Sequence, residues 1–137
     1  MQNQKYKFLK HTADIKFQAY GKTLEKAFEN SAMALKEIII GKLKIKSKIK
    51  KQIKVNALDY ESLLQKFLTE FLYILDAENF IFSKVKVRIK EKELEANITG
   101  DKASNYNFTN SVKATTYSEI FVKKEKGIWV CQIVLDV

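Results

Sequence analysis

The spacing of apolar residues switches twice from an alternating pattern to a helical one, and this limits the folds open to the chain. Apolar residues recur every three or four positions from Leu24 to about Ile40, and again from about Tyr60 to Glu78. Elsewhere apolar and polar residues alternate, which is typical of half-buried strands. The second helical segment has the wider apolar stripe and is expected to be a core helix. The sequence therefore predicts an α+β fold, with two main helices packed on mostly antiparallel sheets of about six to eight strands.

Glycines and short polar residues mark where these elements should begin and end. Thr23 and Asp59 are plausible N-caps of the two helices, and Gly41 is a natural C-cap of the first. Strands are expected at 6–9, 15–20, 43–57 (one long strand or a hairpin), 85–89, 94–98, 112–122 and 128–137. No linker or repeat interrupts the 137 residues, so residues 1–137 are expected to form one domain with one core. The order of the strands does not follow from the sequence.

The chain is strongly basic, with a formal net charge of +9, and Arg88 is its only arginine. Arginine is the usual residue for bidentate phosphate contacts, so a solvated lysine surface is the favoured interpretation. Lys44, Lys46, Lys48, Lys50 and Lys54 occupy alternate positions in the expected strand at 43–57. No aromatic residue is interleaved to stack bases, which favours a solvated or lysine-guarded edge. Attraction to RNA or to an acidic partner stays open as the alternative.

Two features that the sequence lacks bear on where in the cell the protein is expected. No apolar run approaches the roughly 18–20 residues that span a bilayer. The polar start, Met1-Gln-Asn-Gln-Lys5, lacks the apolar region of a secretory signal. The protein is therefore expected in the cytoplasm, without a membrane partner.

The chain lacks the residues that most enzyme chemistries require. The four glycines look like turn or cap positions, so no glycine-rich phosphate loop is expected. The single cysteine, Cys131, lies in an apolar run and is interpreted as a small buried hydrophobe. One histidine, His11, cannot supply a zinc triad, and no serine lies in a nucleophile elbow. A self-contained hydrolase is not expected.

Carboxylates near the two ends of the chain are the main functional lead. Asp14 follows a break between two strand-like runs, and Asp136 precedes the last residue, Val137. If these ends meet in the fold, Asp14, Asp136 and the terminal carboxylate of Val137 form an anionic site suited to a hard divalent cation. Asp136 should point to the sheet face opposite Trp129. On spacing alone the signal is weak, because most aspartates at strand ends bind water or cap turns.

The arrangement of several segments resembles the archease family. His11-Thr-Ala-Asp14, Ala19-Tyr-Gly21 and Thr23-Leu-Glu-Lys-Ala-Phe28 are similar to its opening. The run from Leu63 to Asp76 is similar to its second helix. Val112-Lys-Ala-Thr-Thr-Tyr117 and the end from Trp129 to Val137 resemble its closing strands. The similarity covers nearly the whole chain in order.

The resemblance implies an accessory protein rather than an enzyme. Archeases assist the RtcB-type RNA ligase, which joins the halves of cleaved tRNA with GTP and a divalent metal. They promote guanylylation and multiple turnover of that ligase, so the covalent chemistry belongs to the partner, with tRNA reached through the complex. The alternative is an RNA-binding or chaperone-like modulator of an RNA-modifying enzyme, such as a tRNA methyltransferase, acting through Lys44, Lys46 and Lys48.

The resemblance also assigns roles to single residues. Asp14, Asp136 and Val137 match the family's metal positions, with calcium the expected cation and magnesium or manganese as alternatives. Lys113 is a possible contact to the ligase or simply an exposed strand lysine. His11 is expected mainly to shape the strand break, with a ligase contact as the alternative. Two positions depart from the family pattern: Lys16 replaces a common glycine, and Ser118 a common histidine.

Overall fold

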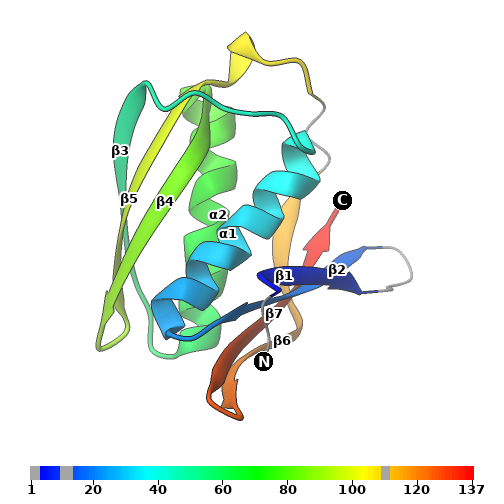
Figure 1. Ribbon diagram of the computed structural model, residues 1–137, viewed down its shortest axis with the longest axis vertical. Helices are drawn as coiled ribbons and strands as arrows, with labels where there is room; N and C mark the ends of the chain where they lie inside the picture. Colours follow the sequence, from blue (N-terminus) through cyan, green and yellow to red (C-terminus); the bar gives the residue numbers. More distant parts are fainter. Residues whose placement is uncertain (1–3, 10–13, 109–111) are drawn as a thin grey trace.

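Two helices lie between two antiparallel sheets in the part of the chain that the computed structural model describes, residues 4–9, 14–108 and 112–137 (Figure 1). One sheet has the strand order β1-β2-β7-β6 and the other the order β3-β5-β4. The strands are β1 (Tyr6–Leu9), β2 (Ile15–Gly21), β3 (Ile49–Asn56), β4 (Phe80–Lys90), β5 (Glu93–Lys102), β6 (Ala114–Glu125) and β7 (Ile128–Asp136). The α-helices are α1 (Leu24–Ile40) and α2 (Tyr60–Glu78), and a short 3-10 helix, η1 (Ala103–Asn105), follows β5. The predicted α+β class is confirmed.

The helix ends are fixed by the caps that the sequence suggests. The Thr23 side chain accepts a hydrogen bond from the Lys26 N–H at 3.1 Å, and Asp59 accepts one from the Ser62 N–H at 2.7 Å. Gly41 ends α1 with φ of 67°. Asn79 ends α2 in the left-handed conformation, which asparagine tolerates better than most residues. These caps satisfy backbone groups that each helix leaves without a partner.

The core lies where the helices meet the two sheets. Each helix contacts strands of both sheets. The rings of Phe28 on α1 and Phe67 on α2 are 5.9 Å apart, and Phe71 packs 4.5 Å from Phe82 on β4. Phe28 and Phe67 are completely buried. This burial confirms the prediction of a core position for α2, and α1 shares it.

The expected strand at 43–57 is only partly correct. The strand begins at Ile49 and pairs with β5 from Ile49–Gly100 to Asn56–Glu93. Before it, the Lys48 N–H still reaches the Gly100 carbonyl at 2.8 Å, but the Lys46 N–H donates to the Tyr106 hydroxyl instead of to a strand. Because the sheet offers no neighbouring strand at 43–47, alternation alone does not produce one there.

No helix in the described residues combines the length and the apolar character that crossing a membrane would require.

Candidate functional site

Asp14 and Asp136 flank the last residue pair of the β2–β7 ladder. The two strands are antiparallel and in register from Gly21–Trp129 to Ile15–Leu135. Asp14 comes directly before Ile15, and Asp136 directly after Leu135, so the next position of the same register sets the two aspartates opposite each other. The start of β2 and the end of β7, more than a hundred residues apart in the sequence, therefore meet at one end of the four-stranded sheet (Figure 1).

The place of Asp136 in β7 explains why its side chain is exposed to solvent. Leu135 is completely buried, whereas Asp136 is exposed. Successive side chains of a strand point to opposite faces, so the burial of Leu135 places Asp136 on the outer face of the sheet. The predicted orientation of Asp136, opposite the face of Trp129, agrees with this alternation.

Lys113 reaches the same end of the sheet through its backbone. Its N–H donates to the Asp136 carbonyl at 2.7 Å, one residue before Ala114 pairs with Asp136. The Lys113 residue is exposed. Val137 is half-buried and packs against the core. The structure thus brings Asp14, Asp136, Val137 and Lys113 to one place, while His11 lies outside the described residues.

Lys16, one of the two departures from the family pattern, has a carboxylate partner. Its ammonium group lies 3.1 Å from Oε1 of Glu119, and the Lys16 side chain is 17% exposed. Glu119 lies in an irregular stretch of β6 between Thr116 and Phe121 and has a φ of 57°. The second departure, Ser118, lies in the same stretch, where its N–H donates to Oγ1 of Thr116 at 3.3 Å. Glu119 thus neutralises the extra charge of Lys16.

Glutamines hold this stretch of β6 against the outer face of the sheet. The Gln132 side chain donates to the Glu119 carbonyl at 2.7 Å and accepts from the Gln18 amide at 2.9 Å. The Tyr20 hydroxyl donates to Gln18 at 2.9 Å. Sequence reasoning missed Glu119 and Gln132. In the sequence, only the alternating polar residues of β2 and β7 indicate that the two strands share a polar face. Nothing in the sequence indicates the bulge of β6 that carries Glu119.

The donor set constrains any metal that binds here. Among the described residues, no three histidine, cysteine, aspartate or glutamate side chains gather closely enough to hold a metal ion. Asp14 and Asp136 supply the oxygens that hard divalent cations prefer, so the pair suits calcium, magnesium or manganese. Further oxygens would have to come from the terminal carboxylate expected at Val137, from backbone carbonyls or from water.

A broad surface hollow lies elsewhere. Its volume is about 840 Å³, and it opens on the three-stranded sheet between β3, β5 and β4. None of the residues proposed from the sequence as metal ligands or ligase contacts lines it.

Comparison with known proteins identifies the family. A model of the archease protein family (MTH1598/TM1083) matches residues 6–137. Protein archease of Methanosarcina mazei is 38% identical over 143 residues, covering 99% of this chain and 98% of the relative, and protein archease of Pyrococcus furiosus is 37% identical over 141 residues, covering 98% and 99%.

Solved structures agree with this match. The solution structure of Methanobacterium thermoautotrophicum protein 1598 superposes with a TM-score of 0.86 at 32% identity, covering 97% of this chain and 99% of that one. A crystal structure from Thermotoga maritima, described as an archease and possible chaperone, shares the fold with a TM-score of 0.68 at 16% identity, covering 100% and 98%. The chain belongs to the archease family.

Proposed function

We propose that the protein acts in the cytoplasm as an accessory factor that activates an RtcB-type RNA ligase. It promotes guanylylation of the ligase and its multiple turnover, and the covalent chemistry stays with the ligase. The observation that carries the proposal is the β2–β7 register, which sets the half-buried Asp14 opposite the exposed Asp136 at one end of the sheet. Family membership supports the same role.

The working surface is the end of the sheet formed by Asp14, Asp136, Val137 and Lys113. Two carboxylates here create a local negative charge in a chain whose net charge is +9. Their mutual repulsion favours binding of a cation between them. The hydrogen bond from the Lys113 N–H to Asp136 fixes the start of β6 beside the carboxylates, where the lysine can contact the ligase.

A divalent cation held by Asp14, Asp136 and the terminal carboxylate of Val137 would supply positive charge to neutralise the phosphate during guanylyl transfer. The aspartates would hold and orient this charge. Calcium is the first choice because its coordination tolerates irregular oxygen sets, and magnesium or manganese are the alternatives.

The test measures guanylylation of the purified ligase with labelled GTP, and multiple-turnover joining of RNA ends, with and without this protein. Asp14→Asn and Asp136→Asn keep the side-chain shape but remove the charge, so each should abolish the stimulation. Extending the chain beyond Val137 by a few residues should do the same. Binding of Ca²⁺, followed by calorimetry, should be lost in both Asn variants.

Asp76→Asn is the matched control, because Asp76 is an exposed aspartate on α2 that takes no part in the β2–β7 end. It should stimulate the ligase like the wild type. Thermal melting of each variant separates lost function from lost folding. If the folded Asp14→Asn and Asp136→Asn variants stimulate guanylylation as fast as the wild type, the proposed role is wrong.

A further inference from the structure

The outer face of the three-stranded sheet is polar along its whole length. Both helices pack on its other face, where Ile53, Val87, Leu94, Ala96 and Ile98 are buried. The register defines four outward rows across β3, β5 and β4: Lys50–Thr99–Lys84, Gln52–Asn97–Lys86, Lys54–Glu95–Arg88 and Asn56–Glu93–Lys90. No element of the described residues covers this face (Figure 1).

Positive charge is concentrated on the two outer strands of this face. Lys84, Lys86, Arg88 and Lys90 form a line along β4, and Lys50 and Lys54 lie on β3. Arg88 makes only an exposed contact with Glu95, at 3.4 Å. Within the described residues the five lysines make no ion pair. A row of like charges on one face repels itself, and an anionic partner offsets that repulsion.

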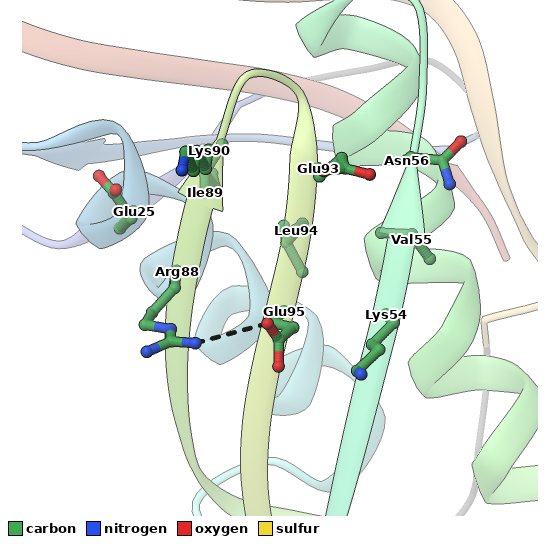
Figure 2. A pocket seen from close by; sticks show the side chains of 10 residues that line it. All are labelled: Glu25, Lys54, Val55, Asn56, Arg88, Ile89, Lys90, Glu93, Leu94 and Glu95. Atoms are coloured by element: carbon green, nitrogen blue, oxygen red, sulfur yellow. Dashed lines mark hydrogen bonds and ion pairs between the residues drawn. The ribbon is translucent and has the colours of Figure 1, made fainter.

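The two halves of the face differ in charge. Figure 2 shows one half, a hollow where Lys54, Arg88 and Lys90 are accompanied by Glu25, Glu93 and Glu95. The other half is a hollow of about 590 Å³ that contains Lys50, Lys84 and Lys86 around Asn97 and Thr99. No carboxylate lines this second hollow. The second half is therefore the stronger anion site.

We propose that this face binds single-stranded RNA through its phosphate backbone, with Lys50, Lys84 and Lys86 as the main contacts. Alternate residues of a strand are about 6.6–6.8 Å apart, which is close to the separation of successive phosphates in a nucleic-acid strand. Asn97 lies between the lysines, and its side-chain N–H groups can donate hydrogen bonds to phosphate or ribose oxygens. The choice of RNA among polyanions rests on the proposed function.

The composition of the face argues against a protein as the occupant. Protein interfaces centre on buried apolar and aromatic side chains, and none of the twelve residues in the four rows is aromatic or apolar. The lack of aromatic residues also excludes base stacking, so binding should be independent of sequence. The expected lysine strand at 43–57 contributes only Lys50 and Lys54, because Lys44, Lys46 and Lys48 precede β3.

The experiment measures binding of a fluorescently labelled single-stranded RNA oligonucleotide by anisotropy at several salt concentrations. The triple variant Lys50→Gln, Lys84→Gln, Lys86→Gln should lower the affinity about tenfold or more at low salt. It should also reduce the slope of log affinity against log salt by about 2, because three phosphate contacts are lost. Replacing Glu95 by glutamine should raise the affinity, since it removes a negative charge from the adjoining half.

The matched control is Lys7→Gln, Lys42→Gln, Lys124→Gln, which removes three exposed lysines away from this face and gives the same net charge. The control should change the affinity less than twofold. Equal losses in the two triple variants would show that only net charge matters and would overturn the site. Polyglutamate binding as tightly as RNA, with the same sensitivity to the first triple, would overturn the assignment to RNA.

A second readout keeps this proposal separate from the ligase proposal. Ligase guanylylation, assayed without RNA, should be unchanged by Lys50→Gln, Lys84→Gln, Lys86→Gln. A loss of guanylylation in that variant would assign the lysines to ligase contact and overturn RNA binding as their role. If Asp14→Asn leaves guanylylation intact, the ligase proposal fails, and the RNA measurement still decides the present one.

Discussion

Glu29 on α1 accepts a hydrogen bond from the backbone N–H of Val87 on β4, with 2.8 Å between Oε2 and the nitrogen. β4 is an edge strand of its sheet, and this N–H points away from its partner strand β5. On the other sheet, Glu61 of α2 accepts from the Val122 N–H of the edge strand β6 at 3.0 Å. Each helix therefore uses one glutamate to satisfy a backbone donor that an edge strand would otherwise leave unpaired.

Replacing Glu29 by alanine should destabilise the fold by about 1–3 kcal/mol, because the Val87 N–H is buried and would lose its acceptor. Urea unfolding should show a lower midpoint with an unchanged slope. Glu29→Gln keeps an acceptor oxygen and should cost less. Equal stabilities of the alanine variant and the wild type would contradict this role.

A second prediction concerns Tyr6, whose hydroxyl donates to Glu37 on α1 at 2.8 Å. Burial, this hydrogen bond and the negative charge of Glu37 raise the pKa of Tyr6 from 10.0 to about 12. A raised pKa in the folded state means that the stabilisation is complete below pH 10 and is lost between pH 10 and 12. The wild type should therefore lose stability relative to Tyr6→Phe across that range.

Chemical unfolding at a series of pH values tests this difference, and subtracting the two proteins cancels the common titration of the lysines. Because the pKa values of Tyr20 and Tyr106 are also raised, absorbance of tyrosinate should show one fewer late-ionising tyrosine in Tyr6→Phe than in the wild type. A stability difference that stays constant from pH 9 to 12 would refute the coupling.

Asp101 and Tyr106 anchor the segment that precedes β3. The Tyr106 hydroxyl donates to Asp101 at 2.8 Å and accepts from the Lys46 N–H at 2.9 Å. The hydrogen bond from Tyr106, followed by those from the Lys102 N–H and Asn105, lowers the pKa of Asp101 below 3.8. Its stabilisation is present above pH 3.8 and is lost as pH falls through the lower, folded pKa. Asp101→Asn should therefore destabilise the protein at pH 7.

The difference between Asp101→Asn and the wild type should shrink as the solution is acidified below pH 4. Asp76→Asn, on the exposed side of α2, serves as the control and should change stability little at either pH. The same stability loss for Asp101→Asn at pH 3 and pH 7 would argue against a charge-assisted hydrogen bond.

The sequence predicts local elements well where the local signals agree. Helix α1 runs from Leu24 to Ile40 as expected, because the apolar spacing, the Thr23 cap and Gly41 all point to the same limits. No strand forms at 43–47, because the alternation of apolar and polar residues is a local signal, whereas a strand also needs a neighbouring strand to pair with. Only the fold decides that β5 offers no partner there.

The candidate site, too, is predictable from local signals only in part. The aspartates can be singled out by their places beside strands, yet their proximity depends on pairing β2 with β7, which are more than a hundred residues apart. The alternation of residues along the last strand does predict that Asp136 points away from the face of Trp129. Glu119 could not be found, because its approach to Lys16 depends on the irregular stretch of β6.

Cys131 should be chemically inert in the folded protein. Its side chain is completely buried, and burial raises the pKa of the thiol to about 12. The thiolate is the reactive form, so at pH 8 both access and ionisation oppose reaction. Iodoacetamide labelling followed by mass spectrometry should be negligible in buffer and complete in denaturing urea. Rapid labelling of the folded protein would contradict the buried position.

The pairing of Lys16 with Glu119 predicts how the candidate metal site should respond to charge. Glu119→Gln removes a carboxylate and leaves Lys16, two residues from Asp14, without its 3.1 Å partner. The loss of this one negative charge makes the potential near Asp14 and Asp136 more positive. Binding of Ca²⁺ should weaken about fivefold, since a unit charge near a protein surface changes such energies by about 1 kcal/mol.

The double variant Lys16→Gly, Glu119→Gln separates the two contributions. It removes the lysine charge as well and should restore most of the Ca²⁺ affinity measured by calorimetry. Lys16→Gly alone removes a positive charge near Asp14 and should bind the cation more tightly than the wild type. If all three variants bind Ca²⁺ like the wild type, the Lys16–Glu119 pair has no influence on cation binding at Asp14 and Asp136, and this prediction is wrong.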